Sequence, residues 1–169
     1  QGTDSILFTL PASDFDILMG KYLSVAAVYT VALVFSLTQV IVLEILGNPD
    51  VGVIVSTYIG YWLSGLALLS VGMFASSLTG SATVAFVLGS LFCAVPVLIG
   101  YYFNGWVGIE RFGFSWHLRD FTLGLVPLGN VVYFISLTVF MLYLNLIVIS
   151  KRHWSRGQQF GLAGQYFVR

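Results

Sequence analysis

The chain has 169 residues, of which 58% are hydrophobic and only 8% are charged, and its formal net charge is zero. Soluble domains carry about 25% charged residues, so this composition excludes an ordinary water-soluble domain and indicates an integral membrane protein. The balanced charge gives no reason to expect a nucleic-acid partner. A single cysteine, Cys93, excludes a disulfide within the chain.

The first 20 residues predict two short helices that meet at a corner at Pro11. Thr3 is placed to cap the first helix, and Asp4 lies in its first turn, where a carboxylate stabilises the helix dipole. The proline ends this helix because the residue before a proline is displaced from helical geometry. Ser13 and Asp16 fit a capping box for the second helix. The first helix is too short to be stable alone, so we expect it to lie against another surface.

Four apolar segments predict a bundle of membrane-spanning helices. One span needs about 20 apolar residues, and the run from Val51 to Ile109, which has no Asp, Glu, Lys or Arg, is long enough for two. Turn-forming residues at Gly47–Asp50 and Ser76–Ser81 separate the first three segments. The expected spans are residues 22–43, 51–78, 82–103 and 130–150. The sequence therefore predicts an all-α, polytopic membrane protein with a transmembrane domain over residues 21–150.

Residues 104–129 form the one long connection between the expected spans. They predict one or two short helices that lie in, or dip into, the membrane interface. His117 and Asp120 fall off the apolar stripe of this segment. The positions that repeat at helical spacing are Phe114, Leu118, Phe121 and Leu125.

The distribution of basic residues predicts the orientation. Four spans place both ends of the chain on one side, and the other side has only Arg111 and Arg119. The side with both ends carries Lys21, Lys151, Arg152, Arg156 and Arg169. Because cytoplasmic loops are rich in Lys and Arg, we expect residues 1–20 and a tail at 151–169 to be cytoplasmic.

A stripe of small residues is expected to let helix backbones approach closely. Its members are Ser81, Ala85, Gly89 and Cys93, with Gly72 and Ser76 as a second pair. Gln39, near the outer end of the first span, is expected to hydrogen-bond a neighbouring helix. His117 and His153 are far apart and lack companion ligands, so we expect no metal site. The sequence contains no nucleophile elbow, zinc-protease motif or phosphate-binding loop, and we expect neither catalysis nor a cofactor.

The corner sequence Gly2-Thr3-Asp4-Ser5-Ile6-Leu7-Phe8-Thr9-Leu10-Pro11, followed by Gly20-Lys21, resembles the permease subunits of type-2 ABC exporters. The segment from Phe114 to Trp154, with its Arg-Asp-Phe and closing Lys-Arg-His-Trp, is similar to the gliding-motility-associated branch of that family. The chain has Ser5 where the family often has glutamate, and Asp4 stands beside it.

The resemblance implies a six-span permease of the bacterial cytoplasmic membrane, of which this chain lacks the first two spans. It implies a dimer of permease subunits, alike or different, that moves a substrate outward when separate ATPase subunits hydrolyse ATP. The segment 104–129 would form short external helices near the exit. The residues that would couple to the ATPase are Gly2, Thr3, Asp4, Ser5, Ile6, Leu7, Phe8, Leu10 and Pro11. The alternative is a membrane scaffold or assembly factor that does not transport.

Overall fold

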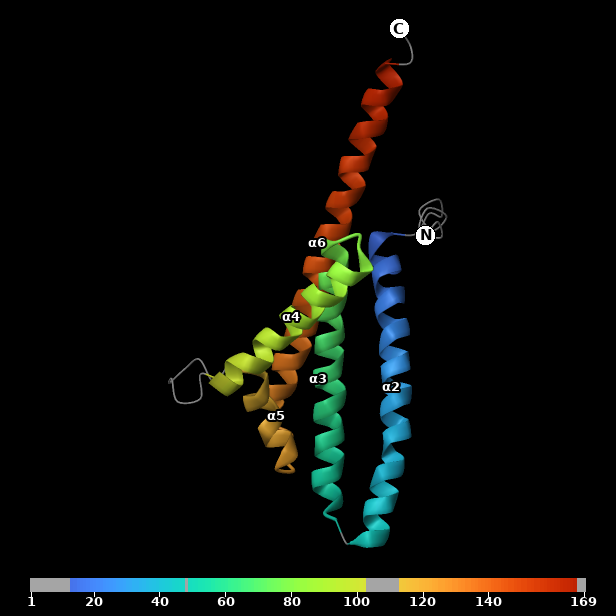
Figure 1. Cartoon of the computed structure of the whole chain (residues 1–169). Helices are drawn as coiled ribbons and strands as arrows, with labels where there is room; N and C mark the ends of the chain where they lie inside the picture. Colours follow the sequence, from blue (N-terminus) through green and yellow to red (C-terminus); the bar gives the residue numbers. More distant parts are fainter. Residues whose placement is uncertain (1–12, 48, 103–112, 167–169) are drawn as a thin grey trace.

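The structure is a computed structural model that describes residues 13–47, 49–102 and 113–166. Within these residues it contains helices and no strands (Figure 1). The helices are α2 (Asp14–Leu46), α3 (Val51–Leu78), α4 (Ala82–Tyr102), α5 (Phe114–Thr122) and α6 (Leu128–Tyr166). The predicted all-helical class is therefore confirmed. The expected helix over residues 1–10 lies outside the described residues.

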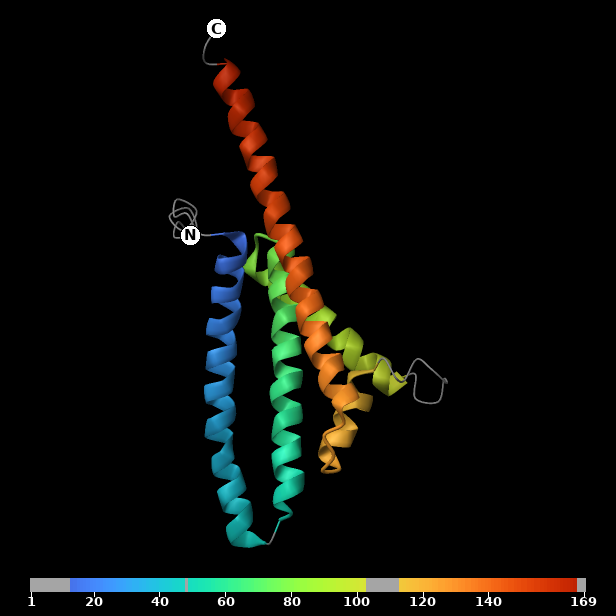
Figure 2. The same cartoon turned by 180° about the vertical axis from the view of Figure 1, so that it is seen from behind.

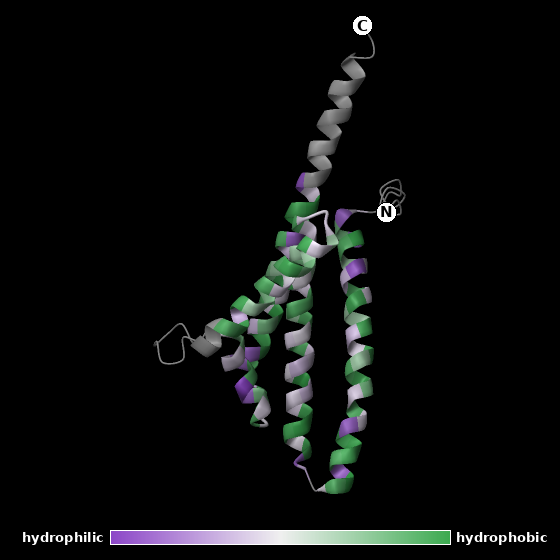
Figure 3. Ribbon diagram, viewed as in Figure 1, coloured by the Kyte–Doolittle hydropathy of each residue, from purple (hydrophilic) through white to green (hydrophobic). Residues whose placement is uncertain are grey.

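Three of the described helices are long and apolar enough to cross a membrane. They are α2, α3 and the part of α6 from Leu128 to Lys151. Helix α4 is also apolar, but its described apolar stretch, Ala82–Leu98, is shorter. A fourth crossing therefore stays a prediction. Hydrophobic residues predominate along these helices (Figure 3), and many of their large apolar side chains are exposed, as expected for contact with lipid.

Helices α2 and α3 form an antiparallel pair, and α6 runs beside α3 in the same direction (Figures 1 and 2). Helix α4 leaves the end of α3 and descends obliquely toward the level of α5. Helix α6 does not stop at residue 150, where the predicted span ends, but continues without a break to Tyr166. In both views this continuation rises beyond the start of α2.

The start of α2 confirms the predicted capping box. The Ser13 side chain accepts a hydrogen bond from the backbone N–H of Asp16 at 3.2 Å, and the Asp16 carboxylate accepts one from the Ser13 N–H at 3.2 Å. The helix then continues without interruption to Leu46. The predicted second corner helix and the predicted first span are consequently one element, because Gly20 alone does not end a helix whose neighbours favour it.

Aromatic side chains join α2 to α3 by a series of hydrogen bonds along the pair. The bonds run from Tyr22 Oη to Leu66 O (3.2 Å), Tyr29 Oη to Tyr61 O (2.7 Å), Tyr58 Oη to Ser36 O (3.0 Å) and Trp62 Nε1 to Thr30 Oγ1 (3.1 Å). Between helices in lipid the hydrophobic effect supplies little attraction, so such bonds and close packing hold the pair together. Gln39 is exposed, and the described residues offer it no interhelical hydrogen bond.

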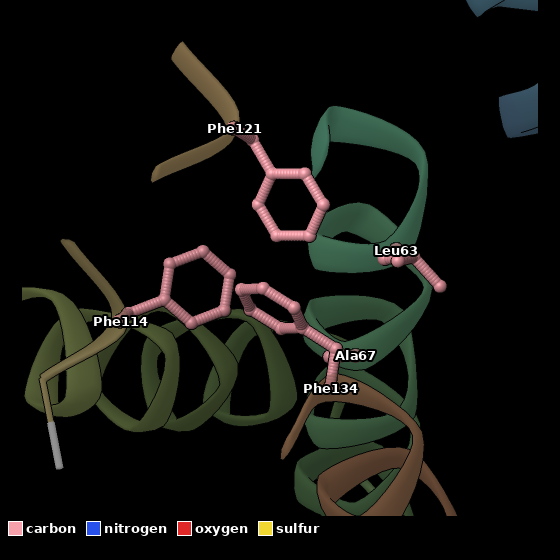
Figure 4. Close-up of a cluster of buried hydrophobic side chains, with 5 residues drawn as sticks. All are labelled: Leu63, Ala67, Phe114, Phe121 and Phe134. Atoms are coloured by element: carbon pink, nitrogen blue, oxygen red, sulfur yellow. The ribbon is translucent and has the colours of Figure 1, made fainter. Parts of the chain in front are cut away.

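A compact hydrophobic core lies where α3, α5 and α6 meet (Figure 4). Its centre is Phe134 of α6, whose ring meets that of Phe114 edge-on at a centroid distance of 5.0 Å. The other buried members are Phe121 of α5 and Leu63 and Ala67 of α3. Ala67 is the one small side chain in this set, and it leaves room on α3 for the phenyl rings.

Asn145 of α6 is buried without a partner for its amide oxygen. Its side chain is 1% exposed, and Oδ1 accepts no hydrogen bond from any described residue. A buried acceptor without a donor destabilises the folded state, because the unfolded chain can pair that group.

Replacing Asn145 with leucine is expected to raise the free energy of unfolding by about 1 kcal/mol, because leucine keeps the branching and the number of side-chain heavy atoms but has no polar atom to pair. Thermal unfolding in a mild detergent measures this. Asn145→Ala is the matched control: it also removes the amide but leaves a cavity, so it should gain less or lose stability. A lower unfolding temperature for Asn145→Leu than for both wild type and Asn145→Ala would contradict this account.

Candidate functional site

Helix α5 has a defined end that fixes its length at nine residues. Gly124 has φ +85°, a left-handed conformation that favours glycine. Its N–H donates to Phe121 O at 3.2 Å, and the N–H of Leu125 donates to Asp120 O at 3.1 Å, which is the Schellman pattern of helix termination. The predicted apolar stripe is therefore wrong at its last position: Leu125 lies beyond the turn and is 59% exposed.

The end of α5 is seated on α3 through Phe121. The ring of this residue is fully buried, and it packs so closely on Gly60 that a Cβ there would lie 2.7 Å from Phe121 Cβ. The carbonyl oxygen of Phe121 accepts hydrogen bonds from Ser56 Oγ at 2.8 Å and Thr57 Oγ1 at 3.3 Å. A helix-terminal carbonyl in apolar surroundings thus obtains donors from the neighbouring helix.

Asn130 joins α5 to the first turn of α6. Its Nδ2 donates to the Asp120 carboxylate at 2.8 Å and to the backbone oxygen of His117 at 3.0 Å, and its Oδ1 lies 2.7 Å from His117 Nδ1. Asn130 is buried, whereas His117 and Asp120 are half-buried. We call these three residues the α5–α6 clasp. One amide therefore satisfies three polar groups that the packing of α5 removes from solvent.

The clasp also determines which nitrogen of His117 carries a proton. A carboxylate oxygen and a carbonyl oxygen only accept hydrogen bonds, so both must face the NH₂ group of Asn130. The amide oxygen then faces the ring, and His117 Nδ1 must donate to it. The imidazole ring stacks on Tyr133 at a centroid distance of 3.9 Å and an interplanar angle of 19°. Two residues of α6 thus fix the His117 ring in position: Asn130 bonds its edge, and Tyr133 stacks on its face.

The opposite face of α5 is exposed. It carries Trp116 and Arg119, with the hydroxyl residues Ser115 and Thr122 beside them. The C-terminal end of α5 lies beside the first three turns of α3, because Phe121 packs on Gly60, about 13 Å along the helix from Val51, and a Cβ at Gly124 would lie 3.2 Å from Val53 Cγ2. Figure 3 shows the hydrophilic colours of α5 at this level, beside apolar stretches of the longer helices. The predicted interfacial segment therefore includes a short amphipathic helix that packs against the side of α3.

Two members of the small-residue stripe on α4 lie against α3. A Cβ at Gly89 would lie 3.7 Å from Ala75 Cβ, and Cys93 Sγ approaches Leu68 O at 3.8 Å. Ala85 is half-buried, and Ser81 is exposed. In the second pair, Ser76 is exposed, and a Cβ at Gly72 would meet no atom within 4 Å.

The expected ATPase-coupling residues lie outside the described part of the chain, so their role stays a prediction. The described residues contain no group of three or more His, Cys, Asp or Glu side chains placed to hold a metal ion. Sequence reasoning missed Asn130 and Ser56. A polar amide in the first turn of an apolar helix was the available signal for Asn130, since such a residue in a membrane segment generally has a bonding partner.

No protein-family model, curated protein or solved structure matches this chain.

Proposed function

We propose that the chain is part of the permease subunit of an ATP-binding cassette exporter of the type-2 class. In this proposal a separate ATPase subunit hydrolyses ATP, and the spans of two permease subunits carry the substrate outward across the cytoplasmic membrane. The resemblance of residues 2–21 to the corner of such permeases is the observation that carries the proposal. The apolar helices, and the amphipathic α5 packed against the side of α3, are compatible with it.

The α5–α6 clasp has a defined role in this proposal. It holds α5 to the first turn of α6, so that a displacement of α6 would move α5 with it. Helix α6 continues to Tyr166, well past the level at which α2 begins (Figure 2). A continuous helix transmits displacement along its length, and we propose that α6 links events at the ATPase end to the surroundings of α5.

Replacing Phe8 with aspartate is expected to weaken binding of the ATPase at least tenfold while the permease stays inserted. An apolar anchor in a protein–protein groove commonly contributes about 2 kcal/mol, and a carboxylate cannot replace it. The measurement is recovery of the ATPase encoded with this chain, in a detergent pull-down that uses the full-length permease. Gln158→Asp is the control for an added negative charge.

Wild-type recovery of the ATPase by the Phe8→Asp permease would contradict the coupling assignment. Failure of any ATPase to copurify with the wild-type permease would favour the alternative, a membrane scaffold without transport.

A further inference from the structure

Arg119, on the exposed face of α5, is a cation without a counter-ion among the described residues. The adjacent carboxylate of Asp120 turns to the other side of the helix, where its Oδ2 accepts the hydrogen bond of Asn130 at 2.8 Å. Between Asp50 and Lys151, these are the only charged residues that the structure describes. The carboxylate adjacent to Arg119 in sequence is therefore bonded within the clasp, and the Arg119 side chain stays exposed.

Apolar side chains flank this guanidinium on the same face of α5. Trp116, three residues earlier, is 40% exposed, and Leu123, the C-cap residue just past the end of the helix, is 62% exposed. Tryptophan is enriched at the level of lipid headgroups, because its ring is apolar and its indole N–H can donate a hydrogen bond. The exposed surface of α5 thus combines one cation with two side chains suited to contact with lipid.

The position of α5 limits what can neutralise Arg119. The end of α5 packs on the first three turns of α3, at Gly60 and Val53, so Arg119 lies beside helices that carry many exposed apolar side chains. A guanidinium exposed to hydrocarbon is costly, and in membrane proteins such groups reach toward headgroups and water. A phosphate group fits this requirement, because its oxygens accept two parallel hydrogen bonds from a guanidinium.

We propose that Arg119, flanked by Trp116 and Leu123, binds the phosphate of an anionic phospholipid whose acyl chains lie on the neighbouring apolar helix surface. An anionic headgroup is favoured over a zwitterionic one, because choline would bring a second cation to the same place. The site does not depend on the exporter proposal, since it requires only α5 and the bilayer.

The test is the apparent affinity of the purified full-length protein for phosphatidylglycerol, measured by thermal stabilisation during lipid titration in a neutral detergent. Arg119→Gln is expected to weaken this affinity about fivefold, the usual contribution of one basic residue near an anionic lipid. Arg119→Lys keeps the charge and should retain most of the affinity. Phosphatidylcholine should stabilise wild type and Arg119→Gln equally.

Lys151→Gln is the matched control, because it also removes one exposed positive charge, but at the far end of the apolar stretch of α6 that begins at Leu128. It should leave the affinity within twofold of wild type. Equal losses in the two glutamine variants would show a general charge effect and overturn the site. An unchanged affinity in Arg119→Gln would also overturn it. Equal stabilisation by inorganic phosphate would identify a free anion, and not a lipid, as the occupant.

Discussion

Replacing Asn130 with alanine is expected to lower the free energy of unfolding by about 3 kcal/mol, because the variant leaves a carboxylate and a backbone carbonyl in a poorly solvated place without their donor. Asn130 donates to Asp120 Oδ2 at 2.8 Å and to His117 O at 3.0 Å, and it accepts a hydrogen bond from His117 Nδ1 at 2.7 Å. The measurement is thermal unfolding of the purified protein in detergent. Gln39→Ala, which shortens an exposed amide side chain on α2, is the control and should change stability little.

A double-mutant cycle with Asp120→Ala distinguishes the clasp from a general effect of losing Asn130. If the loss of stability in Asn130→Ala arises from the unpaired Asp120 carboxylate, removing that carboxylate should restore part of the lost stability. The double variant should then be more stable than the sum of the two single losses predicts. Hydrogen exchange should locate the change, with faster exchange in α5 and the first turn of α6 than in the α2–α3 pair. Strict additivity of the two losses would contradict direct coupling between the residues.

Replacing Gly60 with alanine is expected to destabilise the protein by about 2 kcal/mol, although alanine is the better helix former. The added methyl group would lie 2.7 Å from Phe121 Cβ and 2.8 Å from its Cγ. The root of a side chain cannot rotate away from such a contact, so α5 must move off α3. That movement would also lengthen the bond from Ser56 Oγ to Phe121 O, now 2.8 Å.

Gly72→Ala is the matched control for Gly60→Ala, because both glycines lie in α3. A Cβ at Gly72 meets no atom within 4 Å, so only the helix propensity changes, and this variant should be stabilised by up to about 1 kcal/mol. Thermal unfolding of the two variants should therefore give shifts of opposite sign. Shifts of the same sign and size would mean that α5 does not rest on Gly60 in the membrane.

Local features of the fold were predictable from the sequence because they depend on neighbouring residues. The capping box of Ser13 and Asp16 and the break between α2 and α3 at residues 47–50 are of this kind. The expected second span, residues 51–78, has the bounds of α3, and the helix includes Ser76 and Ser77 of the expected linker, because serine is tolerated in an apolar helix when its hydroxyl bonds a preceding carbonyl. In the same way Ser77 Oγ donates to Phe74 O at 2.7 Å.

The partners of polar side chains were less predictable. Gln39 was the expected interhelical donor or acceptor, but the bonds between α2 and α3 come mainly from tyrosine hydroxyls that reach across to backbone carbonyls. The sequence pattern assigns tyrosine no bonding role between these helices. The tyrosine hydroxyl lies far from the tyrosine backbone, so which carbonyl it bonds depends on how the two helices are aligned.

The sequence by itself determined the apolar, membrane-like composition, the helical class and the approximate position of each long apolar helix. These follow from the lack of charge and from the requirement that backbone groups in lipid bond within their own segment. Only the tertiary structure decided that Asp120 faces Asn130, that Phe121 rests on Gly60 and that Arg119 is left exposed. The physical reason is that residues far apart in sequence meet only once α3, α5 and α6 are packed, and nothing within a single helix fixes that packing.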